Sequence, residues 1–223
     1  MLTVMLAVIY PFLAHAAVVG HSDSLTAASL ACLALAGLAP GLRERRAAAF
    51  FWAAALGAGI AALYRAHIAG LPLYAPPIVV DVSLATLFGL TLRRGQTPLI
   101  ERLVRLLHAP DEELHADILR YARRLTAAWA ILFVLLALID AALALCTVPG
   151  GILHLAGIRP PVAVSPATWS LFANFMGLAI VAIFFLLEYA YRRRRFPQQP
   201  YRNIFDFLER AARVGRQAVW PGR

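Results

Sequence analysis

The sequence predicts an all-α protein that crosses a membrane with about six helices. Hydrophobic residues make up 61% of the 223 residues and charged residues only 15%. The mean hydropathy of +0.70 lies above that of soluble globular domains. The apolar residues form segments long enough to cross a bilayer, and the arginines gather between alternate segments. These observations favour a polytopic membrane protein over a soluble one.

A helix that crosses about 30 Å of hydrocarbon needs about 20 residues, most of them apolar. Six segments approach this length, and they cover residues 2–19, 25–39, 47–68, 76–92, 125–148 and 169–191. We take them as one transmembrane helical domain, residues 1–191, followed by a basic tail, residues 192–223. No internal repeat, linker or low-complexity tract points to a second domain.

The ends of two segments carry helix signals. Three short polar residues, 22–24, can cap the second helix through their side-chain oxygens. The pair Pro76 and Pro77 suits the first turn of the fourth helix, where a missing N–H group costs nothing. Gly37 and Pro40 both disfavour a helix, so we expect the second helix to end near them.

The arginines predict the orientation of the chain. All 21 basic residues are arginine. With Met1 in the cytoplasm, three of them fall in the loop 41–46, seven in the segment 93–124 and nine in the tail, whereas Arg65 and Arg159 fall outside. Short loops rich in arginine stay cytoplasmic. We therefore expect an even number of spans, with both termini in the cytoplasm.

Four consecutive arginines, Arg192 to Arg195, directly follow the last apolar segment. They can act as a stop at the inner interface, where Tyr189, Tyr191 and Phe196 would lie at headgroup depth. They can also form a specific binding site, but the stop is the simpler interpretation. Glu188 precedes Arg192 by one helical turn, so its carboxylate can either extend to the headgroups or pair with Arg192.

Residues 98–123 predict more than a connector. A helix here would place apolar residues on one side, namely Leu99, Ile100, Leu103, Val104 and Leu107, and polar residues on the other, namely Glu101, Arg102, Arg105 and His108. Pro110 ends this helix, and the acidic residues 111–113 suit the first turn of a new one. We expect the new helix to run unbroken into the fifth span, with Arg120, Arg123 and Arg124 at the headgroups.

The tail also predicts an amphipathic helix. Asn203 can cap it, and Ile204, Phe207 and Leu208 would line one side. This helix either lies on anionic lipid or packs against the segment 98–123.

Ionisable residues within apolar segments are costly and need a partner or a function. His15, Asp81 and Asp140 fall in three different segments, and at about 1.5 Å per residue all three reach the outer half of the membrane. There they could form one polar cluster, in which an imidazole between carboxylates could relay protons or act as a general base. The residues that could approach it from other spans are Tyr10, Arg65, His67 and Asn174. The alternative is that Asp81 and Asp140 each satisfy a separate interhelical hydrogen bond.

The sequence contains no motif for classical chemistry. It has no zinc-protease helix, no nucleophile elbow, no phosphate-binding glycine loop and no metal-ligand spacing, so we predict no catalytic residue, metal or cofactor. Nucleic acid is not an expected partner, because the arginines follow the membrane faces without a platform for base stacking.

Three stretches carry a family pattern: LRRGQTPLIERLVRL, LRYARRLTAAWAILF and WSLFANFMGLAIVAIFFLLEYAYRRRRFP. The residues that carry it are Thr91, Pro98, Tyr121, Arg124, Trp129, Phe172, Asn174, Glu188 and Tyr189. Over residues 91–206 the chain resembles a family of predicted bacterial inner-membrane proteins that are encoded among genes for aryl-polyene pigments of the xanthomonadin type. The family has no assigned active site, so the resemblance implies no catalytic residue.

The resemblance implies a bacterial inner-membrane location and a pathway in which acyl chains are assembled on acyl carrier proteins. These carriers are acidic, and a cytoplasmic face rich in arginine would attract them, or a synthase, through long-range electrostatics. We therefore expect a non-enzymatic anchor or assembly partner for acyl-carrier-dependent aryl-polyene or lipid biosynthesis. The alternative is a transporter or lipid-handling protein that uses His15, Asp81 and Asp140. An acyl-modifying enzyme is least favoured, because the sequence shows no nucleophile–base pair.

Overall fold

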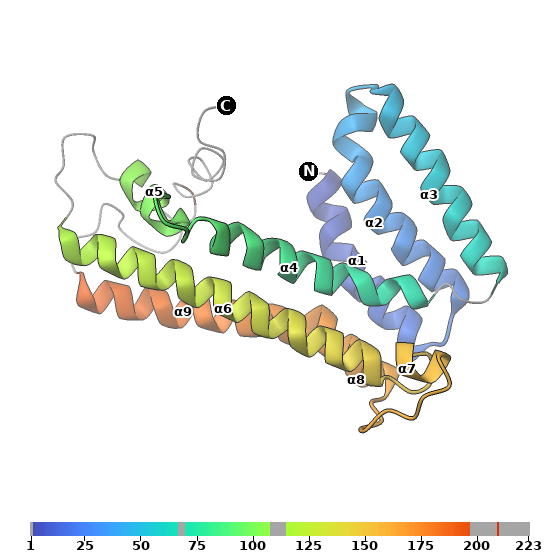
Figure 1. The fold of residues 1–223 in the computed structure, drawn as a ribbon. Coiled ribbons are helices and arrows are strands. Elements are labelled where there is room, and N and C mark those ends of the chain that lie inside the picture. The colour runs from blue at the N-terminus through green and yellow to red at the C-terminus, as the bar shows by residue number, and fades with distance from the viewer. Residues whose placement is uncertain (1, 67–69, 108–114, 197–208, 210–223) are drawn as a thin grey trace. The chain divides into compact units, whose positions relative to one another are not determined.

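The computed structural model describes residues 2–66, 70–107, 115–196 and 209, apart from the side chains of Leu2 and Val4. Of this part, 82% is helix and none is strand, which confirms the all-α class (Figure 1). The helices are α1 (Leu2–Val19), α2 (Asp23–Arg43), α3 (Ala47–Arg65), η1 (Leu71–Tyr74), α4 (Ala75–Leu90), α5 (Leu99–Leu107), α6 (Ala116–Cys146), α7 (Ile152–Leu155), α8 (Pro166–Leu171), η2 (Phe172–Met176) and α9 (Gly177–Arg195).

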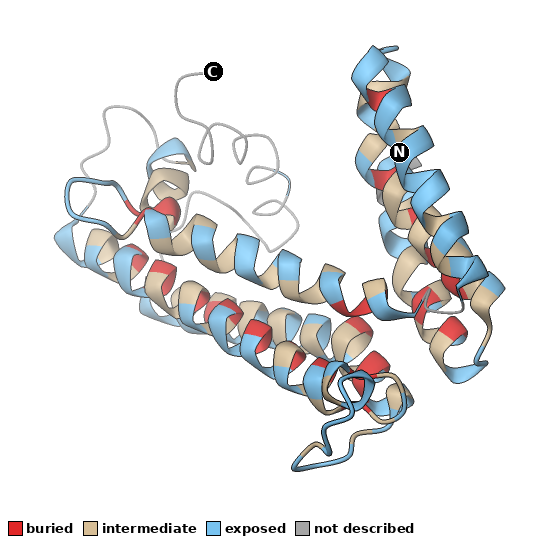
Figure 2. Cartoon of the chain, turned by 45° about the vertical axis from the view of Figure 1, so that its right-hand side comes forward, coloured by how far each residue is buried: buried red, intermediate tan, exposed pale blue. Residues whose placement is uncertain are grey.

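Five helical stretches of the described chain are long and apolar enough to cross a membrane: Asp23–Arg43, Ala47–Arg65, Leu71–Leu90, Ala116–Cys146 and Pro166–Arg195. The apolar stretch Met5–Val19 is shorter, so the expectation of about six spans is compatible with the structure. Figure 2 shows long exposed strips on these helices. Phe51 and Trp52 on α3 are 66% and 56% exposed, and Leu178 on α9 is 67% exposed. Surfaces of this kind suit hydrocarbon rather than water.

Helix α2 ends later than the sequence predicts. α2 starts after Ser22, whose Oγ accepts the Leu25 N–H at 3.3 Å, so the expected cap is confirmed. The helix then continues past Pro40 to Arg43, four residues beyond the expected end. A proline removes one hydrogen bond, but in hydrocarbon the remaining backbone groups can be satisfied only within the helix, which favours its continuation.

The fifth span belongs to one long helix, as the sequence predicts. α6 runs unbroken over 31 residues from Ala116 to Cys146, so the approach to the membrane and the span form one helix. The acidic first turn expected at residues 111–113 and the helix expected in the tail lie outside the described residues.

The chain divides into two compact units, which we describe separately. Unit 1 consists of Met1–Val79 and Ala137–Ala179, and unit 2 of Val80–Leu136 and Ile180–Arg223. The core of unit 1 joins α1, η1, the end of α6 and α8 through Ala14, Leu73, Tyr74, Ala144 and Trp169. The rings of Tyr74 and Trp169 have centroids 4.4 Å apart and supply most of the apolar area of this core.

The core of unit 2 is aromatic. Trp129 of α6 contacts Phe133 of the same helix, Phe88 of α4 and Phe184 of α9, with ring centroids 5.7, 6.0 and 4.6 Å away. Trp129 and Phe133 are 8% and 5% exposed. One tryptophan therefore holds three helices of this unit together.

Threonine side chains fix the amphipathic helix α5 in unit 2. The Leu99 N–H donates to Oγ1 of Thr91 at 3.0 Å, and the Ile100 N–H donates to Oγ1 of Thr126 at 3.3 Å. Each hydroxyl also donates to a carbonyl of its own helix, Phe88 O and Ala122 O respectively, both at 2.8 Å. The first N–H groups of a helix lack intrahelical partners, so the two threonines act as a cap supplied from outside α5.

Replacing Thr91 and Thr126 by valine should loosen α5 without unfolding the protein. Loss of a helix cap costs about 0.5–2 kcal/mol, which corresponds to a rise of roughly two- to thirtyfold in amide exchange at Leu99 and Ile100 if these amides exchange by local opening. Hydrogen exchange read by mass spectrometry in detergent measures it. Thr147→Val is the matched control, because Thr147 is as buried as Thr126 but lies just after α6 in unit 1, where its side chain bonds to Leu143 O and Tyr74 and not to α5. Unchanged exchange of α5 in the double variant would contradict the assignment of the cap.

Candidate functional site

The structure places the three expected members of the polar cluster in different surroundings. His15 on α1 and Asp140 on α6 belong to unit 1, and Asp81 on α4 belongs to unit 2. Asp140 is 3% exposed, whereas His15 and Asp81 are partly buried. His15 bonds to a serine and contacts a phenylalanine ring, as described next. Convergence of all three residues stays a prediction.

A serine network lies at the side chain of His15. Nδ1 of His15 is 3.1 Å from Oγ of Ser170 on α8, across 155 positions of the sequence. Nδ2 of Asn174 donates to the same Oγ at 3.1 Å and to the Ser170 carbonyl at 2.9 Å. Ser170 has no exposed surface and Asn174 is 9% exposed. We call His15, Ser170 and Asn174 the serine network.

A local widening of the last span helps to form this network. Residues Phe172–Met176 form a single π-helical turn, in which the Gly177 N–H bonds to the Phe172 carbonyl five residues earlier. A π turn adds one residue to a helix and rotates the side chains that follow, and such turns are frequent at functional sites. Asn174 lies inside this turn, and its side-chain amide donates a hydrogen bond to the Ser170 carbonyl.

Aromatic rings cover the serine network. The Phe175 ring meets the His15 ring edge-to-face with centroids 5.4 Å apart, and the Phe12 ring meets Phe175 at 5.3 Å. Phe12 is 60% exposed on the surface of α1. The network therefore lies beneath a thin aromatic layer at the apolar surface of unit 1.

Unit 1 also contains a cavity of about 330 Å³ near the start of α2. His21, Ser22, Asp23 and Tyr74 contribute polar atoms to its wall, and the Trp169 ring contributes an apolar surface. Within the described chain, no three His, Cys, Asp or Glu side chains come together as metal ligands.

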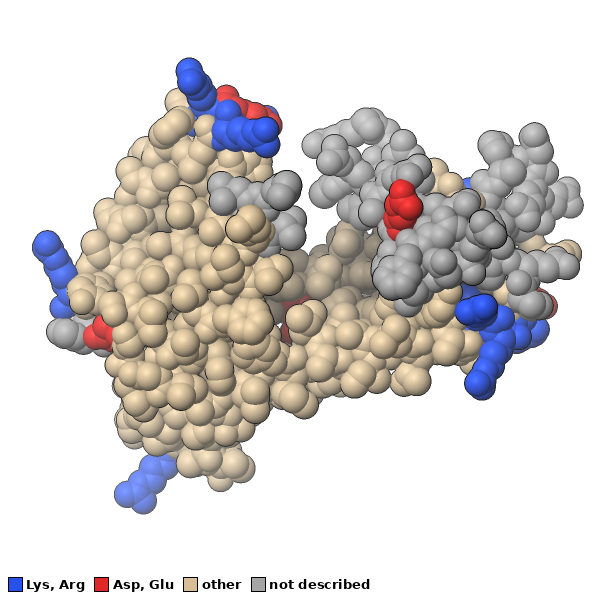
Figure 3. All heavy atoms as spheres, turned by 180° about the vertical axis from the view of Figure 1, so that it is seen from behind, with Lys and Arg blue, Asp and Glu red and all other residues tan. Residues whose placement is uncertain are grey.

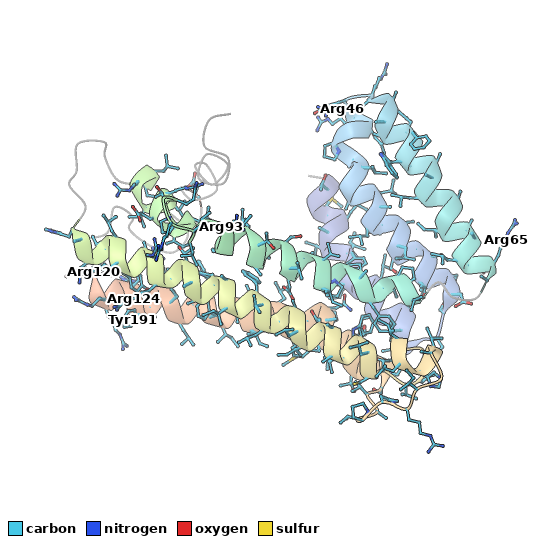
Figure 4. The ribbon with its side chains drawn as sticks, in the orientation of Figure 1. Arg46, Arg65, Arg93, Arg120, Arg124 and Tyr191 are labelled. Carbon is cyan, nitrogen blue, oxygen red and sulfur yellow. The ribbon has the colours of Figure 1, made fainter. Side chains whose placement is uncertain are left out.

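The charged residues of unit 2 gather where α6 begins and α9 ends. We call the arginine face the set Arg93, Arg94, Arg102, Arg105, Arg120, Arg123, Arg124, Arg192, Arg193, Arg194 and Arg195. Figure 4 shows Arg120 and Arg124 near Tyr191 at this end of the helices, and Arg93 at the end of α4. Figure 3 shows that blue atoms lie at helix ends and that the visible surface between them has few charges.

Local contacts join the parts of the arginine face. The Arg123 guanidinium donates to the Leu92 carbonyl at 2.9 Å, which ties α6 to the segment after α4. Arg105 donates twice to Glu101, one turn earlier on α5. Arg102 donates to Gln96 at 3.3 Å. These contacts hold the backbone of the face in place and leave most of its guanidinium groups exposed to solvent.

Glu188 and Arg192 form the ion pair that their spacing allows. Nε of Arg192 is 2.8 Å from Oε1 of Glu188, and the side chains are 13% and 6% exposed. The Tyr121 hydroxyl of α6 donates to the same Oε1 at 3.0 Å. The Tyr121 ring also stacks on Tyr191 at 5.9 Å. This ion pair therefore links α9 to α6 beneath the arginine face.

Reasoning from the sequence missed Ser170. Serine is common in helices, and its partner His15 lies 155 positions away, so no spacing rule connects the two. Two signals pointed to Asn174 instead, namely its depth in the last span and its place in the family pattern.

Comparison of the chain with protein-family models, curated proteins and solved structures finds no match.

Removing one partner of the buried ion pair should destabilise unit 2 more than removing both charges. Arg192→Gln leaves a buried carboxylate without its cation, which costs about 3–5 kcal/mol. The double variant Glu188→Gln/Arg192→Gln keeps two amides that can bond to each other, so we expect it to recover more than half of that loss. Thermal unfolding in detergent measures both, and Arg193→Gln, at an exposed neighbour, should change little. A double variant as unstable as Arg192→Gln would contradict the role of the pair.

Proposed function

We propose that the protein is a membrane anchor that recruits an acidic soluble protein to its arginine face. The partner that fits best is an acyl carrier protein or a synthase that carries one, in aryl-polyene or lipid biosynthesis. The face would lie on the cytoplasmic side of a bacterial inner membrane, as the distribution of arginines favours. Recruitment of this kind requires no reaction by the chain itself.

The excess of positive charge on the arginine face is the observation that carries this proposal. The segments 93–107, 115–124 and 188–195 contain eleven arginines but only three carboxylates, those of Glu101, Asp117 and Glu188. Glu188 is buried and already paired. The exposed remainder of the face therefore carries a strongly positive potential, which raises the association rate of an acidic partner.

The structure of unit 2 suits a docking face that is held in shape. α5 is fixed at its start by Thr91 and Thr126, and the α6–α9 contact is fixed by Glu188 and Tyr121. Side chains on a fixed backbone lose less conformational entropy when a partner binds. Arginine also binds carboxylates and phosphates with two parallel hydrogen bonds, which fits the acidic surface and phosphopantetheine group of a carrier protein.

A lipid-handling role is a second candidate, and the burial of Asp140 within an apolar helix of unit 1 favours it. Under this alternative, Asp81→Asn combined with Asp140→Asn would abolish movement of lipid or protons in vesicles. Under the recruitment proposal, the same double variant binds the acidic partner as the wild-type chain does.

Binding of a purified acyl carrier protein to the full chain in phosphatidylcholine nanodiscs tests recruitment, because these discs contain no anionic lipid. We expect binding that weakens as salt rises from 50 to about 300 mM, since surface charges are screened. Arg94→Glu/Arg124→Glu should raise Kd at least about tenfold, because each reversal replaces an attraction by a repulsion at an exposed site.

Arg65→Glu/Arg159→Glu is the matched control, with two exposed arginines reversed outside the arginine face, and it should bind normally. Absence of binding by the wild-type chain at low salt, or equal loss in both double variants, would contradict recruitment by this face. Binding only to discs that contain anionic lipid, with no effect of the carrier protein, would assign the face to lipid headgroups alone.

A further inference from the structure

We propose that Ser170 and His15 are the nucleophile and general base of an acyl-transfer site in unit 1, and that the substrate is a lipid-borne acyl ester. This proposal rests on the serine network and not on the arginine face, so its test is independent of the test of recruitment.

Ser170 and His15 lie at a distance that suits a nucleophile and its base. A hydroxyl becomes an effective nucleophile when a base lies within about 2.6–3.2 Å of its oxygen, and Nδ1 of His15 lies 3.1 Å from Oγ of Ser170. The amide nitrogen of Asn174 can only donate, so Oγ is the acceptor in that bond. The hydroxyl proton of Ser170 remains available to His15.

The ring of Phe175 helps to orient the imidazole of His15. A catalytic histidine must present one particular nitrogen to its nucleophile. The edge-to-face contact with Phe175 limits rotation of the His15 ring. Nδ1 is thereby directed toward Ser170 on α8, although the two residues come from opposite ends of the chain.

The reaction that the serine network can support is acyl transfer, in which protons move but no oxidation state changes. Oγ of Ser170 attacks the ester carbonyl while its proton passes to Nδ1 of His15. The tetrahedral intermediate collapses, the C–O bond to the leaving alcohol breaks, and His15 returns the proton to that alcohol. A second alcohol, or water, then gives its proton to His15 and attacks the acyl-serine. The bond between the acyl carbon and Oγ breaks, and His15 returns the proton to Oγ of Ser170.

Asn174 lies beside the oxygen that would attack. Its Nδ2 is 3.1 Å from Oγ of Ser170, and the N–H that donates to Oγ can turn to the oxyanion once Oγ has bonded to the acyl carbon. Fixed donors in a water-poor site stabilise an oxyanion more strongly than donors in water do. The π turn that carries Asn174 holds this donor near Ser170.

The surroundings select the class of substrate. The Phe175 ring packs against His15, and the Phe12 ring, which is exposed on the apolar surface of α1, packs against Phe175. An acyl chain can replace these contacts with apolar contacts of its own, whereas a charged substrate would have to lose its hydration. An uncharged ester attached to a hydrocarbon chain therefore fits the site best.

The competing explanation is that the His15–Ser170 bond only ties α1 to α8. A bond with that single role would not make Ser170 more reactive than other serines. Reactivity of the hydroxyl is therefore the measurement that separates the two explanations.

The experiment treats the full chain, purified in detergent, with an alkyl fluorophosphonate, and then maps the labelled residue by mass spectrometry. We expect covalent labelling at Ser170. His15→Gln keeps a hydrogen-bonding side chain of similar length but lacks an effective base, and it should lower the labelling rate about 100-fold or more. Ser24→Ala removes an exposed serine near the start of α2, and His154→Gln alters an exposed histidine of unit 1, so both should be labelled as the wild-type chain is.

A second measurement needs no variant. Incubation of the wild-type chain with p-nitrophenyl octanoate should release p-nitrophenol and leave an octanoyl group on Ser170, which intact-mass and peptide spectra detect. Absence of both adducts from the wild-type chain, labelling at a serine other than Ser170, or an unchanged rate in folded His15→Gln would each overturn the proposal. Reversal of charges at Arg94 and Arg124 should leave the labelling rate unchanged, which separates this test from the test of recruitment.

Discussion

The fold depends on one constraint: a polar group surrounded by hydrocarbon must find its hydrogen-bond partner within the chain. This constraint explains why the described backbone is so largely helical and why α2 continues past Pro40. It also explains the threonines, since the hydroxyls of Thr91 and Thr126 both satisfy a carbonyl of their own helix and cap α5. A polar side chain in this environment is placed by its hydrogen bonds as much as by its packing.

The sequence predicted the features that depend on local order along the chain. Segment length and hydropathy predicted the helices, Ser22 predicted the start of α2, and the amphipathic pattern predicted α5. The spacing of Glu188 and Arg192 indicated their ion pair as one of two outcomes, because residues four apart meet on one side of a helix. Each of these features is decided by neighbours within about one or two helical turns.

Features that depend on the rotation of one helix against another were not predictable in this way. Depth along a span can be counted in residues, and it correctly placed Asn174 in the region of His15. The rotation of a helix about its axis cannot be obtained by counting residues. The sequence therefore did not indicate that Ser170 would lie between His15 and Asn174. The π turn shows the difficulty directly, because one extra residue in the turn changes the direction of every later side chain in α9.

The two buried polar groups differ in what they can do chemically. Glu188 and Arg192 both carry full charges, and arginine does not release its proton, so the pair is static and joins α9 to α6 through the Tyr121 hydroxyl. Ser170 and His15 are joined by one hydrogen bond, along which a proton can pass in the proposed reaction. The apolar surroundings that make the first pair costly to break also strengthen the field that a developing oxyanion experiences from Asn174. The same environment therefore supports a structural role for one group and a reactive role for the other.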